Sequence, residues 1–156
     1  MKIAILCIGK TNEKYLKEGI DIFIKRMHHY VSSIEYKELK DCAKTNDINL
    51  LKTNESMEFL KYISKDDFVV ILDEKGSQFT SSEFATFIEK HQINSTKRMI
   101  FVIGGAFGFS EELYERANQK LSLSKLTFSH QMVRLFFAEQ LYRAFTIIKG
   151  EKYHNE

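Results

Sequence analysis

Three short apolar runs constrain the fold of this chain more than any other feature of its sequence. They cover residues 3–8, 68–72 and 99–103, and none of them contains a polar residue. A strand that is covered on both faces has this uninterrupted pattern, whereas a strand with one exposed face alternates between apolar and polar residues. We therefore expect the three runs to form buried strands of one sheet, with helices packed on both sides.

Helical patterns separate these runs. A capping box, Thr80-Ser-Ser-Glu83, predicts the start of one helix, and Asn12 is the expected cap of another that extends to Met27. Strands that alternate with helices at this spacing predict an α/β fold with a mainly parallel sheet and helices on both faces, in a single domain over residues 1–156. The other expected elements are a weaker strand at residues 34–39 and helices at 48–63, from Ser110 and at 131–149.

Composition excludes several classes of protein. Of the 156 residues, 44% are hydrophobic and 13% aromatic, which excludes a disordered chain. No apolar run approaches the roughly 20 residues that cross a bilayer, and residues 3–8 are too few for a signal peptide. Cys7 and Cys42 form neither a CxxC metal motif nor a disulfide framework. We expect a cytoplasmic protein with no membrane or metal partner.

The net charge of +2 says nothing about partners, but its distribution is uneven. Residues 97–156 carry nine basic and six acidic side chains, and between Glu115 and Glu139 every charged side chain is basic. Such a stretch is compatible with a solvated face and with an RNA contact.

Two strand ends carry residues that are typical of ligand sites. Parallel sheets bind ligands beyond the carboxyl ends of their strands, and here these ends are an expected acidic turn at residues 73–76 and the glycine turn at residues 103–108. The pair Gly104-Gly105 lets main-chain amides approach a ligand, although such a pair is as often only a tight turn. Because no GxGxxG motif follows the first strand, a nicotinamide site is not expected.

The segment Leu121-Ser-Leu-Ser-Lys-Leu-Thr-Phe128 alternates at its start like a short strand and then becomes a loop. Buried loop backbone needs hydrogen-bond partners, which a bound polar cofactor would supply. An ordinary half-buried edge strand is the other interpretation.

The final helix, residues 131–149, is apolar almost all round, which requires burial on nearly all sides. A sheet of this size covers only one side of such a helix. We therefore expect a homodimer through it, with Glu139 and Arg143 as a structural ion pair.

Motifs in a fixed order resemble one family. They are Leu72 ahead of Gly76, Ile103-Gly-Gly-x-x-Gly108, the segment 121–128, His130-x-x-x-Arg134, Glu139-Gln-Leu-Tyr-Arg-Ala144 and Tyr153-His154. Over essentially the whole chain they resemble the bacterial ribosomal RNA large subunit methyltransferase H family, small enzymes of the SPOUT class. The resemblance implies a sheet with a deep C-terminal trefoil knot. It also implies a homodimer that transfers a methyl group from S-adenosylmethionine to N3 of a pseudouridine in 23S ribosomal RNA, on the assembled ribosome.

The resemblance implies site residues by position. For catalysis, Arg134 is the candidate for gripping a phosphate or a ring carbonyl, and His130, Tyr153 and His154 are candidates for the base or for the group that holds it. A histidine that only packs and a frayed tail are the alternative interpretations. The family has Pro before this histidine where the chain has Ser129, which allows a more flexible loop. The cofactor is expected to contact Leu72, Gly104, Gly105, Leu123, Ser124, Lys125, Leu126, Thr127 and Phe128.

Two other functions remain open from the sequence. A related knotted methyltransferase with another target, such as transfer RNA, would be separated by methylation assays on ribosomes and on transfer RNA. A non-catalytic ribosome- or RNA-binding module of the same fold would not bind S-adenosylmethionine in calorimetry. A nucleotide-dependent oxidoreductase is disfavoured by the missing glycine fingerprint.

Overall fold

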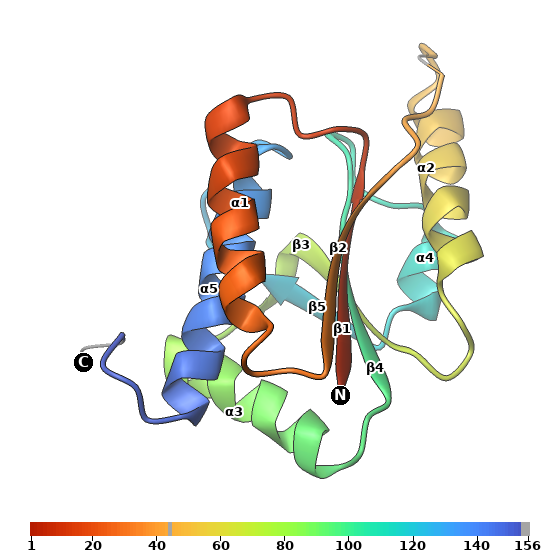
Figure 1. Cartoon of the computed structure of the whole chain (residues 1–156). Coiled ribbons are helices and arrows are strands. Elements are labelled where there is room, and N and C mark those ends of the chain that lie inside the picture. Colours follow the sequence, from red (N-terminus) through yellow and green to blue (C-terminus); the bar gives the residue numbers. More distant parts are fainter. Residues whose placement is uncertain (44, 154–156) are drawn as a thin grey trace.

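The computed structural model describes residues 1–43 and 45–153 as a five-stranded parallel sheet flanked by helices (Figure 1). The strand order is β2-β1-β4-β3-β5, so the three apolar runs form the three central strands, as predicted. The strands are β1 (Lys2–Ile8), β2 (Ser33–Leu39), β3 (Phe68–Gln78), β4 (Arg98–Ile103) and β5 (Gln119–Ser122). The helices are α1 (Lys14–Met27), α2 (Ile48–Tyr62), α3 (Ser81–Ile93), α4 (Glu111–Arg116) and α5 (Met132–Ile148).

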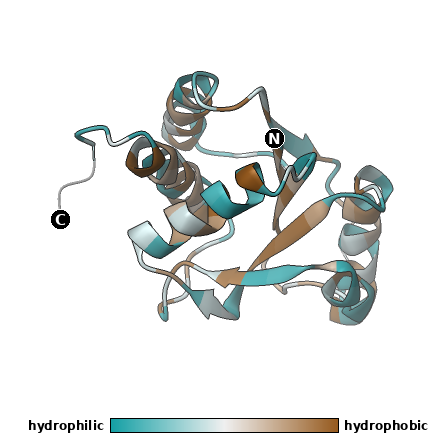
Figure 2. Ribbon diagram, turned by 90° about the horizontal axis from the view of Figure 1, so that it is seen from below, coloured by the Kyte–Doolittle hydropathy of each residue, from teal (hydrophilic) through white to brown (hydrophobic). Residues whose placement is uncertain are grey.

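Helices cover both faces of the sheet, which confirms the expected α/β layers. Helices α1, α3 and α5 lie on one face and α2 and α4 on the other (Figure 1). Alternate residues of the same strand therefore enter two different cores: Ile5 packs with Phe137 of α5, and the adjacent Leu6 packs with Phe59 of α2. The hydrophobic colouring in Figure 2 accordingly gathers in the strands between the helical layers.

Helix starts follow the sequence signals in part. The capping box is present: Thr80 Oγ1 accepts the Glu83 N–H, and the Glu83 carboxylate accepts the Thr80 N–H. Asn12 is not the cap of α1, because the helix begins at Lys14 after Glu13 and has no side-chain cap. The Asn12 N–H donates instead to the side chain of Gln131, just before α5.

The expected acidic turn at residues 73–76 lies inside a strand. β3 continues to Gln78, and its pairing with β5 is interrupted so that Leu121 lies opposite both Leu72 and Ser77. Gly76 closes this bulge: a Cβ there would lie 2.7 Å from main-chain atoms of Lys120 and Leu121. The bulge gives the polar residues 73–76 room to leave the ladder while the strand continues beyond them.

Helix α5 is covered on one side within the chain. It packs against α1 and α3, and its buried residues include Phe137, Leu141 and Phe145. Phe136 on another side of the helix is 42% exposed. No helix within residues 1–43 and 45–153 has an apolar stretch long enough to cross a membrane.

Candidate functional site

The carboxyl ends of β3 and β4 and the end of β5 surround a cavity of about 420 Å³. This volume lies in the range of cavities that bind cofactors and other small molecules. Its position follows from the topology, because parallel strands end at one edge of the sheet and the connecting loops gather there. The cavity extends along the loop after β5 to His130 and Val133 at the start of α5.

The glycine turn after β4 forms one wall of this cavity. Gly104 and Gly105 leave no room for a side chain: a Cβ on Gly104 would lie 2.7 Å from the ring of Phe109, and one on Gly105 would lie 2.6 Å from Glu55 Oε2. Helix α2 holds both ends of the turn, since Glu55 accepts the Gly105 N–H and Ser56 Oγ accepts the Ser110 N–H at 2.9 Å. The turn is therefore fixed in place with its backbone facing the cavity.

The loop after β5 forms the opposite wall and is held by its own side chains. Ser122 Oγ donates to the Ser124 carbonyl at 2.9 Å, and Ser124 Oγ accepts the Leu126 N–H at 2.9 Å. The structure brings to this cavity every residue that was expected to contact the cofactor except Lys125, which is exposed. Those lining the cavity are Leu72, Gly104, Gly105, Leu123, Ser124, Leu126, Thr127 and Phe128.

The bulge of β3 supplies acidic groups to the same cavity. Asp73 and Glu74 line it, and the Tyr114 hydroxyl of α4 donates a hydrogen bond to the Asp73 carboxylate. Burial and this carboxylate raise the pKa of Tyr114, so the phenol stays protonated. The sequence had marked residues 73–76 as a strand end typical of ligand sites but gave Asp73 no role of its own, and Tyr114 was missed altogether.

His130 borders the cavity just before α5 and is exposed. Partial burial and the charge of Arg134 lower its pKa from the ordinary value of 6.5, against the opposing effect of Asp41. The imidazole is therefore neutral at neutral pH and able to accept a proton. Ser129 accepts the Met132 N–H on its side-chain oxygen at 3.1 Å and so gives the loop before the helix a hydrogen bond of its own.

Arg134 is not placed where it would grip RNA. Its side chain is fully buried, and its guanidinium donates to the carbonyls of Ile8 at 2.6 Å, Gly9 at 3.0 Å and His130 at 3.0 Å, and to Thr11 Oγ1 at 3.1 Å. These bonds tie the end of β1 to the first turn of α5. We therefore assign Arg134 to positioning His130 and the adjacent loop rather than to contact with phosphate or base.

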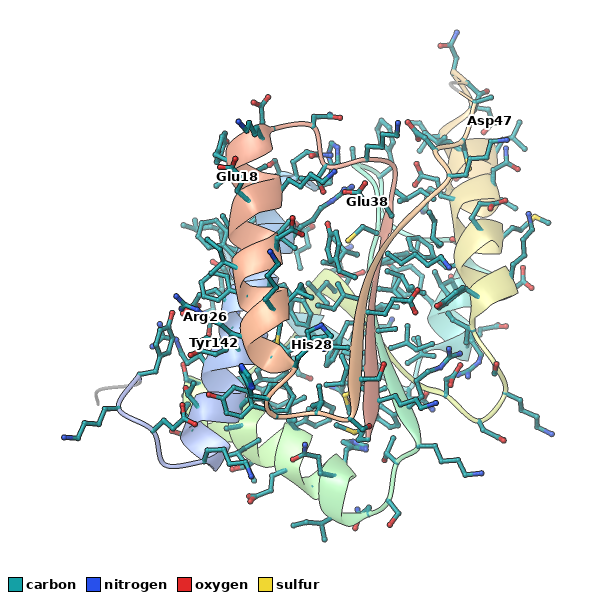
Figure 3. All side chains as sticks on the ribbon, in the orientation of Figure 1. Glu18, Arg26, His28, Glu38, Asp47 and Tyr142 are labelled. Atoms are coloured by element: carbon teal, nitrogen blue, oxygen red, sulfur yellow. The ribbon has the colours of Figure 1, made fainter. Side chains whose placement is uncertain are left out.

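Tyr153 follows the carboxyl end of α5, packs against the middle of that helix and does not line the cavity. Its hydroxyl donates to Glu139 at 3.2 Å, and its ring packs edge-on against Tyr142, which lies on the outer side of α5 beside Arg26 (Figure 3). Arg143 covers the ring of Tyr153 and pairs with Glu139 at 2.5 Å, as expected for that pair. Within one chain the structure thus does not bring Tyr153 together with His130. His154 lies outside the described residues.

The donor set around the cavity is not that of a metal site. Across residues 1–43 and 45–153, no three His, Cys, Asp or Glu side chains lie together as ligands of an ion. Cys7 is buried, which raises its pKa to about 11 and leaves it a protonated core thiol.

Comparison with known proteins agrees with this geometry. A family model described as "Predicted SPOUT methyltransferase" matches residues 1–154. A relative from Christiangramia forsetii named ribosomal RNA large subunit methyltransferase H is 52% identical over 99% of both chains. Relatives of the same name from Cytophaga hutchinsonii and Geotalea daltonii are 49% and 43% identical over 99% of this chain and 100% of their own. The chain therefore belongs to the SPOUT methyltransferase family.

Proposed function

We propose that this protein transfers a methyl group from S-adenosylmethionine to N3 of a pseudouridine in 23S ribosomal RNA, on the assembled ribosome in the cytoplasm. One observation carries the proposal: the loops after β3, β4 and β5 converge on one cofactor-sized cavity in a chain whose full-length relatives are named ribosomal RNA large subunit methyltransferases. The whole chain acts as one catalytic domain in this proposal.

The volume of the cavity and the chemistry of its walls support S-adenosylmethionine as the ligand. Ile103, Leu121 and Leu123 provide apolar surface for a flat base, and the glycine turn provides main-chain groups without side chains in the way. Asp73 and Glu74 provide negative charge for the amino group and the cationic sulfur. When bound, this cofactor supplies an electrophilic methyl group, so the protein's own residues have to align the acceptor nitrogen and manage its proton.

His130 is the described residue best placed for that proton. N3 of the ring is an imide nitrogen and becomes nucleophilic as its proton leaves. A neutral imidazole beside the cavity accepts a proton at neutral pH, and Arg134 holds the carbonyl of His130 from inside the protein. Tyr153 and His154 stay our candidates for the base or for its holder, reaching the site from a second subunit.

A homodimer would explain why Tyr153 does not line the cavity of its own chain. Two copies packed antiparallel along α5 would bring the tail of one to the cavity of the other. Phe136, with Phe128 against it at 5.1 Å, and Tyr15 of α1 next to Met132 provide an apolar face for this contact. The dimer would also give RNA a larger surface than one small subunit offers.

We further propose that the C-terminal part is threaded as a deep trefoil knot. The support is topological: β5 lies at one edge of the sheet, yet the helix that follows it packs against α1, which covers the sheet near the opposite edge. The connection at residues 123–131 therefore passes back across the carboxyl ends of the strands, where it forms a wall of the cavity.

Mass mapping of ribosomal RNA tests the proposed function. RNA from cells that lack the protein should lose one methyl group from a pseudouridine, and purified protein with S-adenosylmethionine should restore it on isolated ribosomes. His154→Ala should slow this transfer greatly while the affinity for S-adenosylmethionine in calorimetry stays near that of the parent. If the missing methyl group were found in transfer RNA instead, transfer RNA would be the substrate. If the protein did not bind S-adenosylmethionine, it would be a non-catalytic RNA-binding module.

A further inference from the structure

A second cavity, of about 590 Å³, lies beside the first at the carboxyl ends of β1 and β2. The two cavities share Gly105, Ala106, Phe107 and His130 as a common wall. A molecule in the second cavity would therefore meet one in the first across the glycine turn and the imidazole. The proposed function needs such a neighbouring site, because the acceptor base has to approach the cofactor.

Carboxylates line the second cavity, together with the exposed Lys10 and Lys40. Glu38, Asp41 and Glu55 line it, and Glu38 already accepts the Thr11 N–H at 2.8 Å. Asp41 lies against Gly9, whose Cβ would be 3.5 Å from the Asp41 carboxyl carbon. Ionised carboxylates accept hydrogen bonds and do not donate them. These carboxylates therefore suit a ligand edge that carries N–H donors.

Glu55 is the acidic residue that is fixed most firmly. Glu55 belongs to α2 and is only 8% exposed. Its carboxylate accepts the Gly105 N–H, and this single bond leaves other acceptor positions of the two oxygens for a ligand. Burial, followed by the nearby Asp41, raises its pKa, and the Gly105 bond opposes this. A buried carboxylate of this kind gains from a further donor, because each hydrogen bond offsets part of its lost hydration.

Phe107 provides a flat surface at the junction of the two cavities. Its side chain lies in the glycine turn and is 52% exposed, so the ring is accessible to a ligand in either cavity. Proteins that take single bases out of RNA commonly stack them on exposed aromatic rings and read their edges by hydrogen bonds. The exposed ring and the carboxylates of the second cavity together fit a base that has left its stack.

We propose that the second cavity receives the target base, stacked on Phe107, and that Glu55 accepts a hydrogen bond from its N1–H. The inference rests on the proposed function and assigns the recognition of pseudouridine to a particular residue. In pseudouridine the sugar is attached to carbon, so both N1 and N3 carry a proton and flank the same carbonyl. In uridine N1 bonds the sugar and has no proton. Glu55 thus distinguishes the two bases, while N3 faces the shared wall and His130.

In this arrangement the protein distinguishes pseudouridine from uridine because uridine leaves the Glu55 carboxylate without a hydrogen-bond donor. A site that is built to accept an N–H rejects an analogue that lacks it by far more than it rejects a small change in size. With uridine, the base would still stack on Phe107, but Glu55 would lose its new donor in a partly dehydrated site. Loss of a hydrogen bond to a charged group corresponds to about a 10- to 100-fold lower rate.

The experiment compares two kinds of ribosome at saturating S-adenosylmethionine. One kind comes from cells that lack this methyltransferase and carries pseudouridine at the target position; the other comes from cells that also lack the pseudouridine synthase and carries uridine. The wild-type protein should have at least a tenfold higher kcat/KM on the first. Glu55→Gln should lower that ratio by about 10- to 100-fold, mainly through the pseudouridine ribosomes, whereas Phe107→Ala should slow both kinds equally.

Glu58→Gln, one turn along the same helix and paired with the exposed Lys61, is the matched control and should keep the wild-type ratio. A wild-type protein that methylates both ribosomes equally would overturn the inference whether or not Glu55→Gln folds, and so would an unchanged ratio in a folded Glu55→Gln. Failure of the wild type to methylate either ribosome, by contrast, would overturn the proposed function itself.

Discussion

The Arg134 guanidinium donates a 2.6 Å hydrogen bond to the main-chain carbonyl of Ile8 and so joins the last helix to the end of the first strand. Three further hydrogen bonds, to Gly9, Thr11 and His130, surround the same group inside the protein. The loop after β1 begins at Gly9, and the loop after β5 ends next to His130, before α5. The buried guanidinium thus fixes the positions of residues that border the cavities without lining either cavity itself.

Replacement of Arg134 should therefore lower the stability of the whole protein, and should not act on methyl transfer alone. Arg134→Ala leaves several buried carbonyls without donors, and we expect a loss of about 3–4 kcal/mol in the free energy of unfolding. Arg134→Lys, which keeps the charge but not the planar set of donors, should lose less. Urea denaturation followed by circular dichroism measures both. Lys17→Ala, at an exposed position on α1, is the control and should stay within about 0.5 kcal/mol of the parent; an equally stable Arg134→Ala would refute the positioning role.

Local signals made much of the fold predictable. The apolar runs became central strands because burial on both faces leaves no place for a polar residue, and the capping box at Thr80 and Glu83 lies within one turn of chain. The glycine turn at Gly104 and Gly105 was also predictable as a wall of the site, because it directly follows an apolar strand and parallel strands place their carboxyl ends together.

Features that depend on distant residues were not predictable. An arginine on a helix looks the same in sequence whether it faces water or the carbonyl of a strand 126 residues earlier. Residues 73–76 have the composition of a turn, and only pairing with Leu121, which arrives later in the chain, keeps them within a strand. Glu55 gave no signal because its partner, Gly105, lies 50 residues away.

Gly76 should tolerate no side chain. A Cβ there would meet main-chain atoms of Lys120 and Leu121 at 2.7 Å, and main chain in a strand pair moves only if the pairing changes. We expect Gly76→Ala to lower the free energy of unfolding by about 2–3 kcal/mol, as overpacking in a rigid region does. Thermal melting measures this effect. Gly150→Ala is the matched control, because nothing lies within 4 Å of its Cβ; its positive φ of 66° limits the cost to about 1 kcal/mol.

Asp67 should make the protein sensitive to acid. Burial alone would raise its pKa, but Arg98, which binds both carboxylate oxygens, and the Ser64 N–H outweigh burial and lower it. A pKa that is lower in the folded state contributes stability above the unfolded value of about 3.9, and this contribution is lost as the pH falls through the folded value. The melting temperature should therefore drop below about pH 4.

Asp67→Asn isolates this contribution. The variant should be less stable than the parent at pH 7 by about 1.5–3 kcal/mol, the range for a hydrogen bond to a charged group, and its melting temperature should fall less steeply below pH 4. Asp66→Asn, the exposed neighbour, should follow the parent curve. Parallel curves for Asp67→Asn and the parent would show that other carboxylates cause the acid sensitivity.

Phe136 tests whether α5 joins two copies of the chain. Its ring is 42% exposed and packs against Phe128, so a charge at this position would be buried in the proposed dimer but accommodated in a monomer. Phe136→Glu should sediment as a folded monomer at micromolar concentration, where the parent sediments as a dimer, because burial of an unpaired charge is costly. Ile93→Glu, at a 74% exposed position on α3, should leave the parent's sedimentation unchanged. Since the proposed active site takes its tail from the second subunit, monomeric Phe136→Glu should still bind S-adenosylmethionine yet fail to methylate ribosomes; full activity in a monomer would show that one chain suffices.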